Sequence, residues 1–430
     1  MVVIDRWECW SLREGPASGA WLLVYGRRKT GKTFLLRRCV DSAVYVTIGR
    51  SGLCLVEEGD EGPRIASLEE GLKAALRAVE SGYAAVIDEF QRLPEEYWDL
   101  LAVSRARGKG RLILCGSSLG VASKVFDRRS PLLGFFAPLK VDLASPSDTL
   151  VSLSTALSPS EAAKWAIVAR DPWLLGLLEP RGDVVEAIAE SAHLLVASAS
   201  GLVGEVFREE ERKLTQLYDA ILRLLALGYW SSAALAQKLH EARLLPRPEA
   251  SLVTGMLAQL AAMGLVERVR MWKTPGARIY YRHRSSLLSL LMALEERGFE
   301  AGLRPSCEVV SSTLGVEAQF FVGELLAEAT GLKRAYAITG TWDVDVVLLK
   351  GERAVAGYEV KLGPFSGSEA SKAVERIRSL GIPRAGLVSL TEEPPPVADE
   401  GYGPSDLVEL ARKTSERLRR ASRSYSRVPP

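Results

Sequence analysis

The sequence predicts an α/β protein of several domains, in which a mainly parallel sheet covered by helices precedes a helical region and a second α/β region. Two observations predict this class. Strand-like and helix-like stretches alternate near both ends of the chain. With 430 residues, 47% of them hydrophobic and 25% charged, the chain has the composition of a globular protein but is too long for one core of ordinary size.

The first region alternates apolar runs with helical patterns, which is typical of a parallel sheet whose strands are joined by helices. The expected strands are 21–25, 43–48, 83–88, 111–116 and 139–143, and the expected helices are 31–40, 67–80 and 94–106. Residues 145–160 follow and are polar and turn-rich, so they predict a domain boundary.

Residues 160 to about 290 lose the strand pattern and are expected to be mostly helical. Three short amphipathic helices are predicted at 215–228, 231–242 and 248–264. Two strands about a Pro-Gly turn follow at 265–284. Three helices and a β-hairpin in this order are the layout of a winged helix-turn-helix.

A third region, at roughly 310–395, again mixes helices and strands. The expected elements are a helix at 317–331, strands at 342–349 and 354–362, a helix at 368–381 and a strand at 385–390. The last 30 residues predict a helix with a basic end, because residues 411–427 hold seven Arg or Lys against Glu416 alone. We expect that end to fray.

Bulk composition excludes several classes. The net charge of +2 exerts no global attraction on nucleic acid, so any such binding must come from a local patch. Five scattered cysteines without a CxxC pair, and only three histidines, argue against a zinc site and against a disulfide framework. The chain shows neither a signal-peptide pattern at its start nor an apolar run near the length of a membrane span, so we expect a cytoplasmic protein that does not contact a membrane.

A phosphate-binding loop is predicted at the first strand-to-helix turn, where GRRKTGKT (26–33) matches GxxxxGK[ST]. Glycines let backbone N–H groups curl around a phosphate, and the helix that starts at Gly31 directs its positive dipole end at the anion. Lys32 adds charge at the β- and γ-phosphates, and the Thr33 hydroxyl is a ligand for Mg²⁺. The alternative is a Gly-rich turn with a solvated lysine. The predicted nucleotide-binding residues are Gly26, Arg27, Arg28, Lys29, Thr30, Gly31, Lys32, Thr33 and Ser117.

An acidic pair follows the third predicted strand. Asp88 comes at the carboxyl end of the apolar run YAAVID, where a carboxylate can hold Mg²⁺ through water. Glu89 comes next and is the candidate general base that polarises the attacking water, with Lys32 as its catalytic partner. The alternative is an acidic pair that only starts a helix. Ser117 follows the fourth strand and is a candidate sensor of the γ-phosphate, although hydroxyls are also common in plain turns.

These motifs together resemble the archaeal ATPase family of the additional-strand, catalytic-glutamate class of P-loop proteins. The resemblance rests on VYGRRKTGKTFLL, VIDEFQRLP, LILCGSS and SPLLG in that order, and extends over about 20–400. It implies ATP and Mg²⁺ as ligands. It also implies a P-loop ATPase core (1–145), a helical lid (146–212), a winged helix-turn-helix (213–300), a restriction-endonuclease-like, PD-(D/E)XK domain (301–395) and a C-terminal helix with a basic tail (396–430).

The chain departs from the family pattern at two positions. Family members carry an arginine after the S-P-L-x-G motif, where this chain has Phe135. Arg128 or Arg129 could substitute, or a protein partner or a second copy could supply an arginine. In the lid, Arg170-Asp171-Pro172 stands where Gly-Gly-x-Pro is usual. ATP binding is therefore a firmer prediction than fast hydrolysis, because an arginine finger contributes about 10³–10⁵ in rate.

The winged helix suggests DNA binding, because its wing is rich in basic and aromatic side chains that suit phosphate contacts. The candidate recognition helix, 248–263, argues against it because it has few side chains able to read bases. A protein-binding or spacer role is the open alternative. The basic residues of the wing are Arg268, Arg270, Lys273, Arg278, Arg282 and Arg284, against Glu267.

The third region carries a nuclease-like pattern. Asp345 and the Glu359-Val360-Lys361 run on the next strand would place two carboxylates and an ammonium around one point, with Glu317 on the preceding helix completing the site. This pattern looks like the PD-(D/E)XK nuclease fold. The alternative is an ordinary Glu-x-Lys alternation on the surface of an edge strand.

The leading interpretation is an ATP-binding, Mg²⁺-dependent ATP-hydrolysing switch protein whose nuclease-like module acts on or near nucleic acid. The alternative is a nucleotide-gated scaffold. In that case the winged helix and the restriction-endonuclease-like domain only bind a partner, and little ATP hydrolysis or nucleic-acid cleavage occurs.

Overall fold

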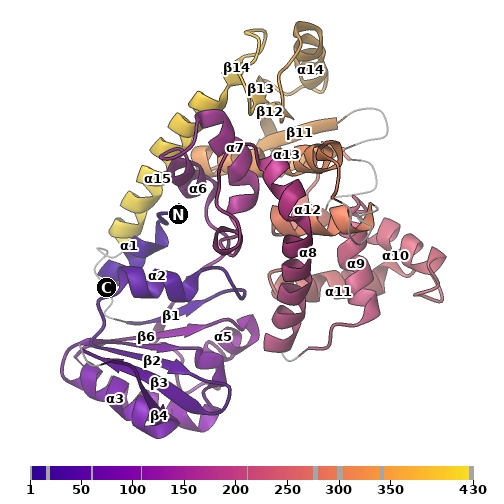
Figure 1. The fold of residues 1–430 in the computed structure, drawn as a ribbon. Coiled ribbons are helices and arrows are strands. Elements are labelled where there is room, and N and C mark those ends of the chain that lie inside the picture. Colours follow the sequence, from indigo (N-terminus) through magenta and orange to yellow (C-terminus); the bar gives the residue numbers. More distant parts are fainter. Residues whose placement is uncertain are drawn as a thin grey trace. The chain divides into compact units, whose positions relative to one another are not determined.

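The computed structural model describes residues 2–15, 20–59, 62–107, 109–210, 212–274, 279–297, 304–338 and 343–425 (Figure 1). The chain folds into two compact units. The N-terminal unit comprises Arg6–Asp142, Glu205–Arg212 and the chain from Arg417, and the C-terminal unit comprises Met1–Asp5, Leu143–Gly204 and Lys213–Glu416.

The N-terminal unit is built on a mixed sheet that, over the described residues, has seven strands in the order β4-β3-β2-β5-β6-β1-β7. The five strands from β2 to β7 in this order run parallel, and β3 and β4 add an antiparallel edge. β6 lies between β1 and β5, so an additional strand separates the P-loop strand from the strand that ends in the acidic pair. The strands are β1 (Trp21–Tyr25), β2 (Val44–Ile48), β3 (Leu53–Glu58), β4 (Arg64–Ser67), β5 (Ala84–Asp88), β6 (Arg111–Gly116) and β7 (Phe136–Lys140).

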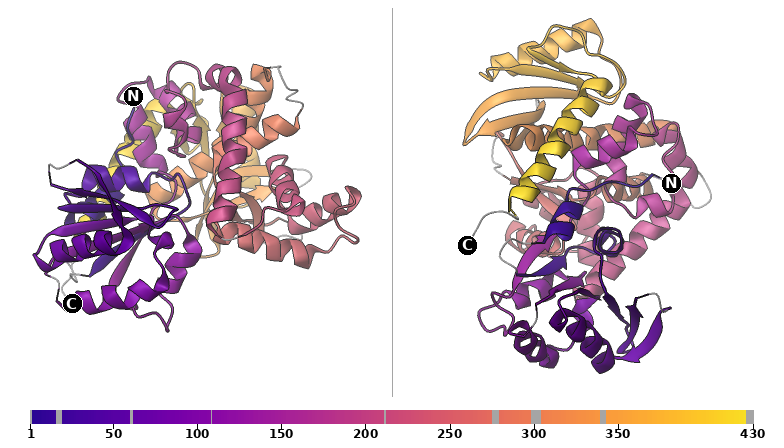
Figure 2. Two further views of the ribbon diagram at one scale, coloured as in Figure 1. Left: turned by 60° about the horizontal axis from the view of Figure 1, so that its bottom comes forward. Right: turned by 90° about the vertical axis from the view of Figure 1, so that its left-hand side faces the viewer.

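Helices cover both faces of this sheet, as a parallel sheet requires. Neighbouring residues of β1 show the two faces, because Leu23 packs into one core with α3, whereas Leu22 packs into another with α1 and α2. Figures 1 and 2 show these helices around the sheet. A capping box between Ser67 and Glu70 starts α3. The helices are α1 (Glu8–Glu14), α2 (Lys32–Cys39), α3 (Leu68–Glu80), α4 (Trp98–Arg105) and α5 (Leu119–Val125).

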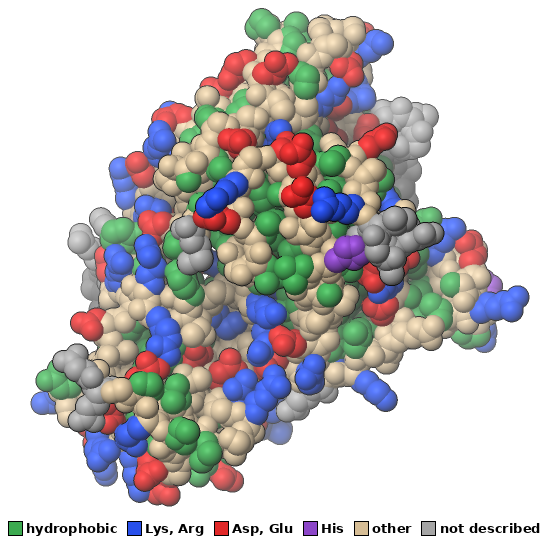
Figure 3. All heavy atoms as spheres, in the orientation of Figure 1, with side chains coloured by type: hydrophobic (Ala, Val, Ile, Leu, Met, Phe, Trp, Pro, Cys, Tyr) green, Lys and Arg blue, Asp and Glu red, His purple; other side chains and the backbone are tan. Residues whose placement is uncertain are grey.

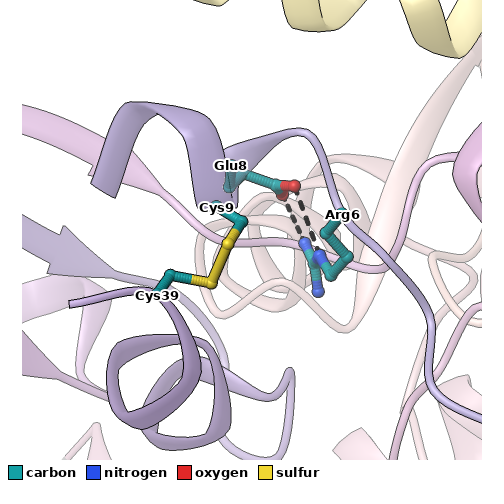
Figure 4. Close-up of a disulfide and its surroundings, with 4 residues drawn as sticks. All are labelled: Arg6, Glu8, Cys9 and Cys39. Carbon is teal, nitrogen blue, oxygen red and sulfur yellow. Dashed lines mark hydrogen bonds and ion pairs between the residues drawn. A yellow bond between two sulfur atoms is a disulfide. The ribbon is translucent and has the colours of Figure 1, made fainter. Parts of the chain in front are cut away.

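A disulfide joins Cys9 of α1 to Cys39 of α2 (Figure 4), a single bond that the cysteine spacing did not predict. Both cysteines are buried where α1 packs on α2 against one face of the sheet. Thirty residues separate them in sequence. No local spacing pattern marks such a pair, because tertiary packing alone brings the two sulfurs together.

The C-terminal unit begins with a helical region. Its first helix, α6 (Pro146–Leu153), lies inside the segment expected to be turn-rich, so that expectation was wrong. Ser145 caps α6 and Pro146 occupies its first turn, which are helix-starting signals as well as turn signals. The helices α7 (Pro159–Ala169) and α8 (Val184–Glu209) follow.

The predicted winged-helix layout is present in the described residues. Helices α9 (Gln216–Ala226), α10 (Ser232–Glu241) and α11 (Ala250–Ala262) precede the antiparallel strands β8 (Val266–Arg270) and β9 (Ile279–His283). The expected Pro-Gly turn, at 275–278, lies outside the described residues. Helix α12 (Ser286–Glu296) packs against α9 and α13.

The last α/β region holds a mixed sheet with, in its described part, five strands in the order β10-β11-β12-β13-β14. Helix α13 starts about ten residues earlier than expected because Ser306 caps it. The edge strands β10 and β14 were not predicted. The elements are α13 (Cys307–Thr330), β10 (Lys333–Ile338), β11 (Asp343–Lys350), β12 (Arg353–Lys361), α14 (Gly367–Ser379), β13 (Ala385–Ser389), β14 (Glu400–Tyr402) and α15 (Pro404–Tyr425).

Two helices, α8 and α13, are long and apolar enough to cross a membrane by length and composition alone, although glutamates interrupt the apolar sequence of both. In α13, 61% of the most apolar window is buried in the fold, which suits the core helix of an α/β domain. In α8, 39% of the corresponding window is buried. The cytoplasmic location therefore stays a prediction.

Candidate functional site

The predicted phosphate loop joins β1 to α2, and its glycines are required by close backbone packing. A Cβ on Gly26 would lie 1.9 Å from the carbonyl oxygen of Val141, so no other residue fits there. Gly31 begins α2 with a φ of 86°, a left-handed conformation that glycine adopts without strain. Lys29 is also left-handed, with a φ of 61°. The sequence therefore forms the curled backbone that can surround an anion.

Lys32 is buried inside this loop. Its ammonium donates hydrogen bonds to the carbonyl oxygens of Gly26, at 2.8 Å, and Arg27, at 2.9 Å. Burial lowers the pKa of Lys32, and the charges of Asp88 and Glu89 are among those that oppose this shift. An anionic phosphate fits such a buried ammonium, because it supplies the opposite charge that two neutral carbonyl groups do not.

Asp88 ends β5 beside the start of α2. Its Oδ2 accepts hydrogen bonds from Thr33 Oγ1 and from the hydroxyl of Tyr45, both at 2.8 Å, and its Oδ1 accepts the backbone N–H of Glu89 at 2.9 Å. Burial, followed by the neighbouring Asp88 charge, raises the pKa of Tyr45. The hydroxyl and carboxylate that the sequence assigned to Mg²⁺ thus lie in direct contact.

Tyr45 was missed by sequence reasoning because it lies inside the ordinary apolar strand β2. Its only signal is the parallel pairing of β2 with β5, which brings Thr47 opposite Asp88 and Tyr45 two residues away on the same face. The position of Tyr45 beside Asp88 follows only once β2 is known to pair with β5.

Glu89 takes a left-handed backbone conformation, with a φ of 59°. Its carboxylate accepts a hydrogen bond from Gln91 Nε2 at 2.7 Å and forms an ion pair with Arg92 at 2.7 Å. Both partners follow within one turn, so the candidate base is held by its own loop. A left-handed non-glycine residue is uncommon and is often found at functional sites.

The end of α8 contributes a set of contacts to the same pocket, which we call the Glu209 network: Arg28, Gln91, Ser117, Glu205 and Glu209. The guanidinium of Arg28 binds Glu205 at 2.6 Å and Glu209 at 2.8 Å. Glu209 also accepts hydrogen bonds from Ser117 Oγ at 3.1 Å and Gln91 Nε2 at 2.9 Å. Neither glutamate was predicted from the sequence, because 177 and 181 positions separate them from Arg28 in the loop.

The pocket between these groups has a volume of about 230 Å³. Neither Arg128 nor Arg129 lines it, and both are exposed, so the expected substitute for the missing arginine is not at the site. Among the described residues, no three His, Cys, Asp or Glu side chains gather in a way that could hold a metal by themselves. The lining residues are Arg28, Lys29, Gly31, Lys32, Thr33, Phe34, Asp88, Glu89 and Ser117.

The carboxylates of the predicted nuclease-like site come together in the C-terminal unit. Asp345 Oδ2 accepts the backbone N–H of Val360 at 2.8 Å. Burial raises the pKa of Asp345 to about 7, and the Glu359 carboxylate adds to the shift. Glu359 forms an ion pair with Arg376 at 2.5 Å, and Lys361 pairs with Glu369 at 2.7 Å. The two acids are close neighbours, whereas the lysine is engaged with α14.

Glu317 lies on the helix where it was predicted, but the described structure does not group it with Asp345 and Glu359. It is buried on α13, where its carboxylate pairs with the guanidinium of Arg282 from β9. Arg282 also lies over the ring of Phe320, 3.9 Å from its centroid, and binds Glu267 at 3.0 Å. The side chain expected to complete the nuclease-like site therefore contacts the wing instead.

Three of the five basic wing residues that the structure describes pair with acidic residues of the C-terminal unit. Besides Arg282, Arg284 binds Glu324 at 2.5 Å, and Arg270 pairs with Glu352. The backbone N–H of Trp272 donates to Tyr336 in β10 at 2.8 Å, so the wing also continues into the α/β region. Arg268 is exposed, and Arg278 lies outside the described residues.

No protein-family model and no curated protein sequence matches this chain. Solved structures with detectable similarity to this chain share little of its sequence. The Aeropyrum pernix ORC2 protein, solved as ADPNP–ADP complexes, is 16% identical, covers 68% of this chain and 94% of its own length, and has a TM-score of 0.38. The Aeropyrum pernix ORC1 protein in complex with DNA is 16% identical over 66% of this chain and 90% of its own, with a TM-score of 0.30.

Cdc6p from Pyrobaculum aerophilum is 15% identical over 72% of this chain and 92% of its own, with a TM-score of 0.25. Similarities with such low sequence identities and TM-scores do not assign the chain to a family. The fold assignment rests on the chain's own strand order, in which a parallel sheet carries a phosphate loop after β1 and an acidic pair after β5.

Proposed function

We propose that this protein is an ATP-binding switch that hydrolyses ATP slowly in the presence of Mg²⁺. The observation that carries the proposal is the 2.8 Å contact between Thr33 Oγ1 and Asp88 Oδ2, in a pocket that also contains the buried ammonium of Lys32. A hydroxyl and a strand-end carboxylate in contact, next to a phosphate loop, are the ligand types that hold Mg²⁺ beside a triphosphate.

Each residue has a distinct task in this proposal. The backbone N–H groups of the loop and Lys32 bind the phosphates. Thr33 and Asp88 hold Mg²⁺, which neutralises phosphate charge when bound. Glu89 orients the attacking water and accepts its proton. Because Gln91 and Arg92 hold Glu89 in the present arrangement, the base must leave these partners before it can act.

The Glu209 network supports a switch rather than a fast enzyme. Arg28 lines the nucleotide pocket, yet its charge is neutralised by Glu205 and Glu209. A γ-phosphate brings additional negative charge near these carboxylates and competes with them for Arg28. ATP binding therefore loosens the end of α8 from the loop, whereas ADP, which lacks that charge, leaves it attached.

Two variants test the nucleotide site. We expect Lys32→Ala to abolish ATP binding, because it removes the buried charge, whereas Glu89→Gln keeps binding and loses turnover by about 10²–10⁴. Binding of a fluorescent ATP analogue and phosphate release measure the two effects. Lys73→Ala, an exposed lysine of α3 paired with Glu69, is the matched control. ATP hydrolysis by Glu89→Gln at the parent rate would show that Glu89 is not the base.

A scaffold role for the winged helix is the second candidate function. The ion pairs of the wing arginines support it. Arg282 and Arg284 are mostly shielded from solvent and pair with carboxylates of the same unit, so they are not free to bind phosphates of DNA. Arg270 pairs with the exposed Glu352. We infer that the wing fixes the winged helix to the α/β region. Duplex DNA binding that is lost in Arg282→Gln and Arg284→Gln, with folding intact, would contradict this role.

A metal-dependent nuclease activity is the proposal for the last α/β region. Its support is the partly buried pair of Asp345 and Glu359, in which the Glu359 charge raises the pKa of Asp345 and a divalent cation would relieve the repulsion. Mg²⁺-dependent cleavage of DNA or RNA should vanish in Asp345→Ala and in Lys361→Ala. Cleavage of none of several DNA and RNA substrates by the parent protein would leave the scaffold role in its place. The assay, run with and without ATP, also tests coupling to the N-terminal unit.

A further inference from the structure

A second pocket in the N-terminal unit lies at the opposite end of α2 from the phosphate loop. Its volume is about 500 Å³, and three arginines line it from three different elements. Arg13 is in the last turn of α1, Arg38 is in the last turn of α2, and Arg111 is the first residue of β6. Among the described residues of the lining, Asp41 is the one acidic residue, so this part of the pocket carries an excess of positive charge.

None of these three guanidiniums pairs with a carboxylate anywhere in the described chain. The neighbouring Arg37 behaves differently, because it binds both carboxylate oxygens of Glu57 at 2.9 and 2.6 Å. Within the described residues, the Arg111 guanidinium makes only a long contact, 3.4 Å, with the carbonyl oxygen of Arg13. Residues 16–19, which are not described, contain no charged side chain that could serve as a partner.

A purely structural role explains this arrangement only in part. An arginine in the last turn of a helix stabilises the negative end of the helix dipole, which accounts for Arg13 and Arg38. Arg111 starts a strand and gains nothing from this effect. Burial lowers the pKa of Arg111, which shows that its charge is kept at a cost. Three like charges around one pocket also repel each other, and an anion between them would remove that repulsion.

The disulfide holds the pocket together. Cys39 is itself part of the lining, and Cys9 lies four residues before Arg13, on the same side of α1. The bond between them (Figure 4) therefore fixes the end of α1, with Arg13, against the end of α2, with Arg38. A site whose charged groups are held in advance loses less entropy when it binds a ligand.

We propose that this pocket is a binding site for a phosphate group, separate from the nucleotide pocket. Guanidinium groups bind phosphate through two parallel hydrogen bonds, a geometry that lysine does not offer, and every cation here is an arginine. The two sites lie at the two ends of α2, which is eight residues long. That helix corresponds to a length of about 12 Å. A single phosphate therefore does not occupy both sites.

Equilibrium dialysis of the full-length protein with labelled inorganic phosphate tests the site. The parent protein is compared with Arg38→Ala and Arg111→Ala, and with Arg107→Ala, an exposed arginine of the same unit that lies outside the pocket. Any binding in the nucleotide pocket is common to all four proteins, so it cancels in the comparison. We expect both pocket variants to bind phosphate at least about tenfold more weakly at one site, and Arg107→Ala to bind like the parent.

Arg38 is exposed, so Arg38→Ala keeps the test valid even if Arg111→Ala folds poorly. Equal phosphate binding by the parent and Arg38→Ala would overturn the proposal. A single-stranded oligonucleotide added as competitor identifies the source of the phosphate. In one outcome the oligonucleotide displaces phosphate from the parent protein and displaces none from the Arg38→Ala variant, which lacks the second site. The natural ligand is then a nucleic-acid backbone. If it displaces nothing, the ligand is a small phosphorylated molecule or phosphate itself.

Discussion

The guanidinium of Arg28 in the phosphate loop lies 2.8 Å from the carboxylate of Glu209 at the end of α8. Glu209 in turn accepts hydrogen bonds from Ser117 and Gln91, and Gln91 holds Glu89. One carboxylate is thus connected to the loop, to the candidate sensor and, through one amide, to the candidate base. The charge state of the nucleotide can act on all three through this residue.

The Glu209 network predicts a change in nucleotide preference when its charge is removed. Glu209→Gln should bind ATP about tenfold more tightly and ADP with nearly unchanged affinity, because only ATP brings a γ-phosphate near this position. Titration of both nucleotides measures the ratio. Glu210→Gln is a matched control, because Glu210 binds the backbone N–H groups of Leu119 and Gly120 instead. An equal effect of both variants would argue against the network.

The buried pair of Arg282 and Glu317 predicts a large and asymmetric loss of stability. Arg282→Met should lower the free energy of unfolding by about 3–5 kcal/mol, because it leaves Glu317 buried without its partner. The double variant Arg282→Met, Glu317→Leu should lose less than the single one. Urea-induced unfolding measures both. A double variant as unstable as the sum of two single ones would mean that the two residues act independently.

His283 predicts a loss of stability in weak acid. It is buried at the end of β9, where its Nε2 bonds the carbonyl oxygen of Leu222 at 2.8 Å, and burial lowers its pKa to about 4. Below the unfolded value of about 6.5 the unfolded chain binds a proton that the folded chain refuses, so stability falls as the pH falls toward 4. We expect about 2 kcal/mol less stability from this residue at pH 5 than at pH 7.

Urea unfolding at the two pH values measures this effect. Other groups titrate in the same range, so the comparison is made with His283→Gln, which can donate to the same carbonyl but cannot be protonated. The pH dependence should be smaller in that variant. An identical pH dependence in both proteins would show that His283 does not cause it.

The disulfide between Cys9 and Cys39 predicts that reduction destabilises the N-terminal unit. The disulfide closes a loop with a sequence separation of 30 residues. Opening a loop of that length by reduction costs about 3–4 kcal/mol of stability. Thermal unfolding with and without a reducing agent measures the change, and Cys9→Ser should reproduce it without any reductant. Cys307→Ser, at an exposed free cysteine, is the control and should leave the melting temperature unchanged.

The sequence predicted those parts of the fold and the site that short segments determine. The phosphate loop needs its glycines for local backbone reasons, and Asp88 follows an apolar strand, so both are recognisable from the order of residues alone. The edge strands β3 and β4 were missed because they are partly exposed, with Ile65 74% exposed, and therefore lack the apolar run that marked the central strands.

The missed contacts share a different cause. Glu209 reaches Arg28, Arg282 reaches Glu317 and Cys9 reaches Cys39 only because helices and strands distant in sequence pack together. Charge counting along the wing predicted a basic surface. It could not show that carboxylates from another part of the chain would pair with that charge, since pairing depends on tertiary structure alone.

The docked wing has a consequence for salt dependence. Nucleic acids gain affinity by releasing condensed counterions to a free cationic surface, and this gain weakens as salt rises. The guanidiniums of Arg270, Arg282 and Arg284 already have counterions that are covalently part of the protein. Whatever this winged helix binds, its arginines should contribute little to that salt sensitivity.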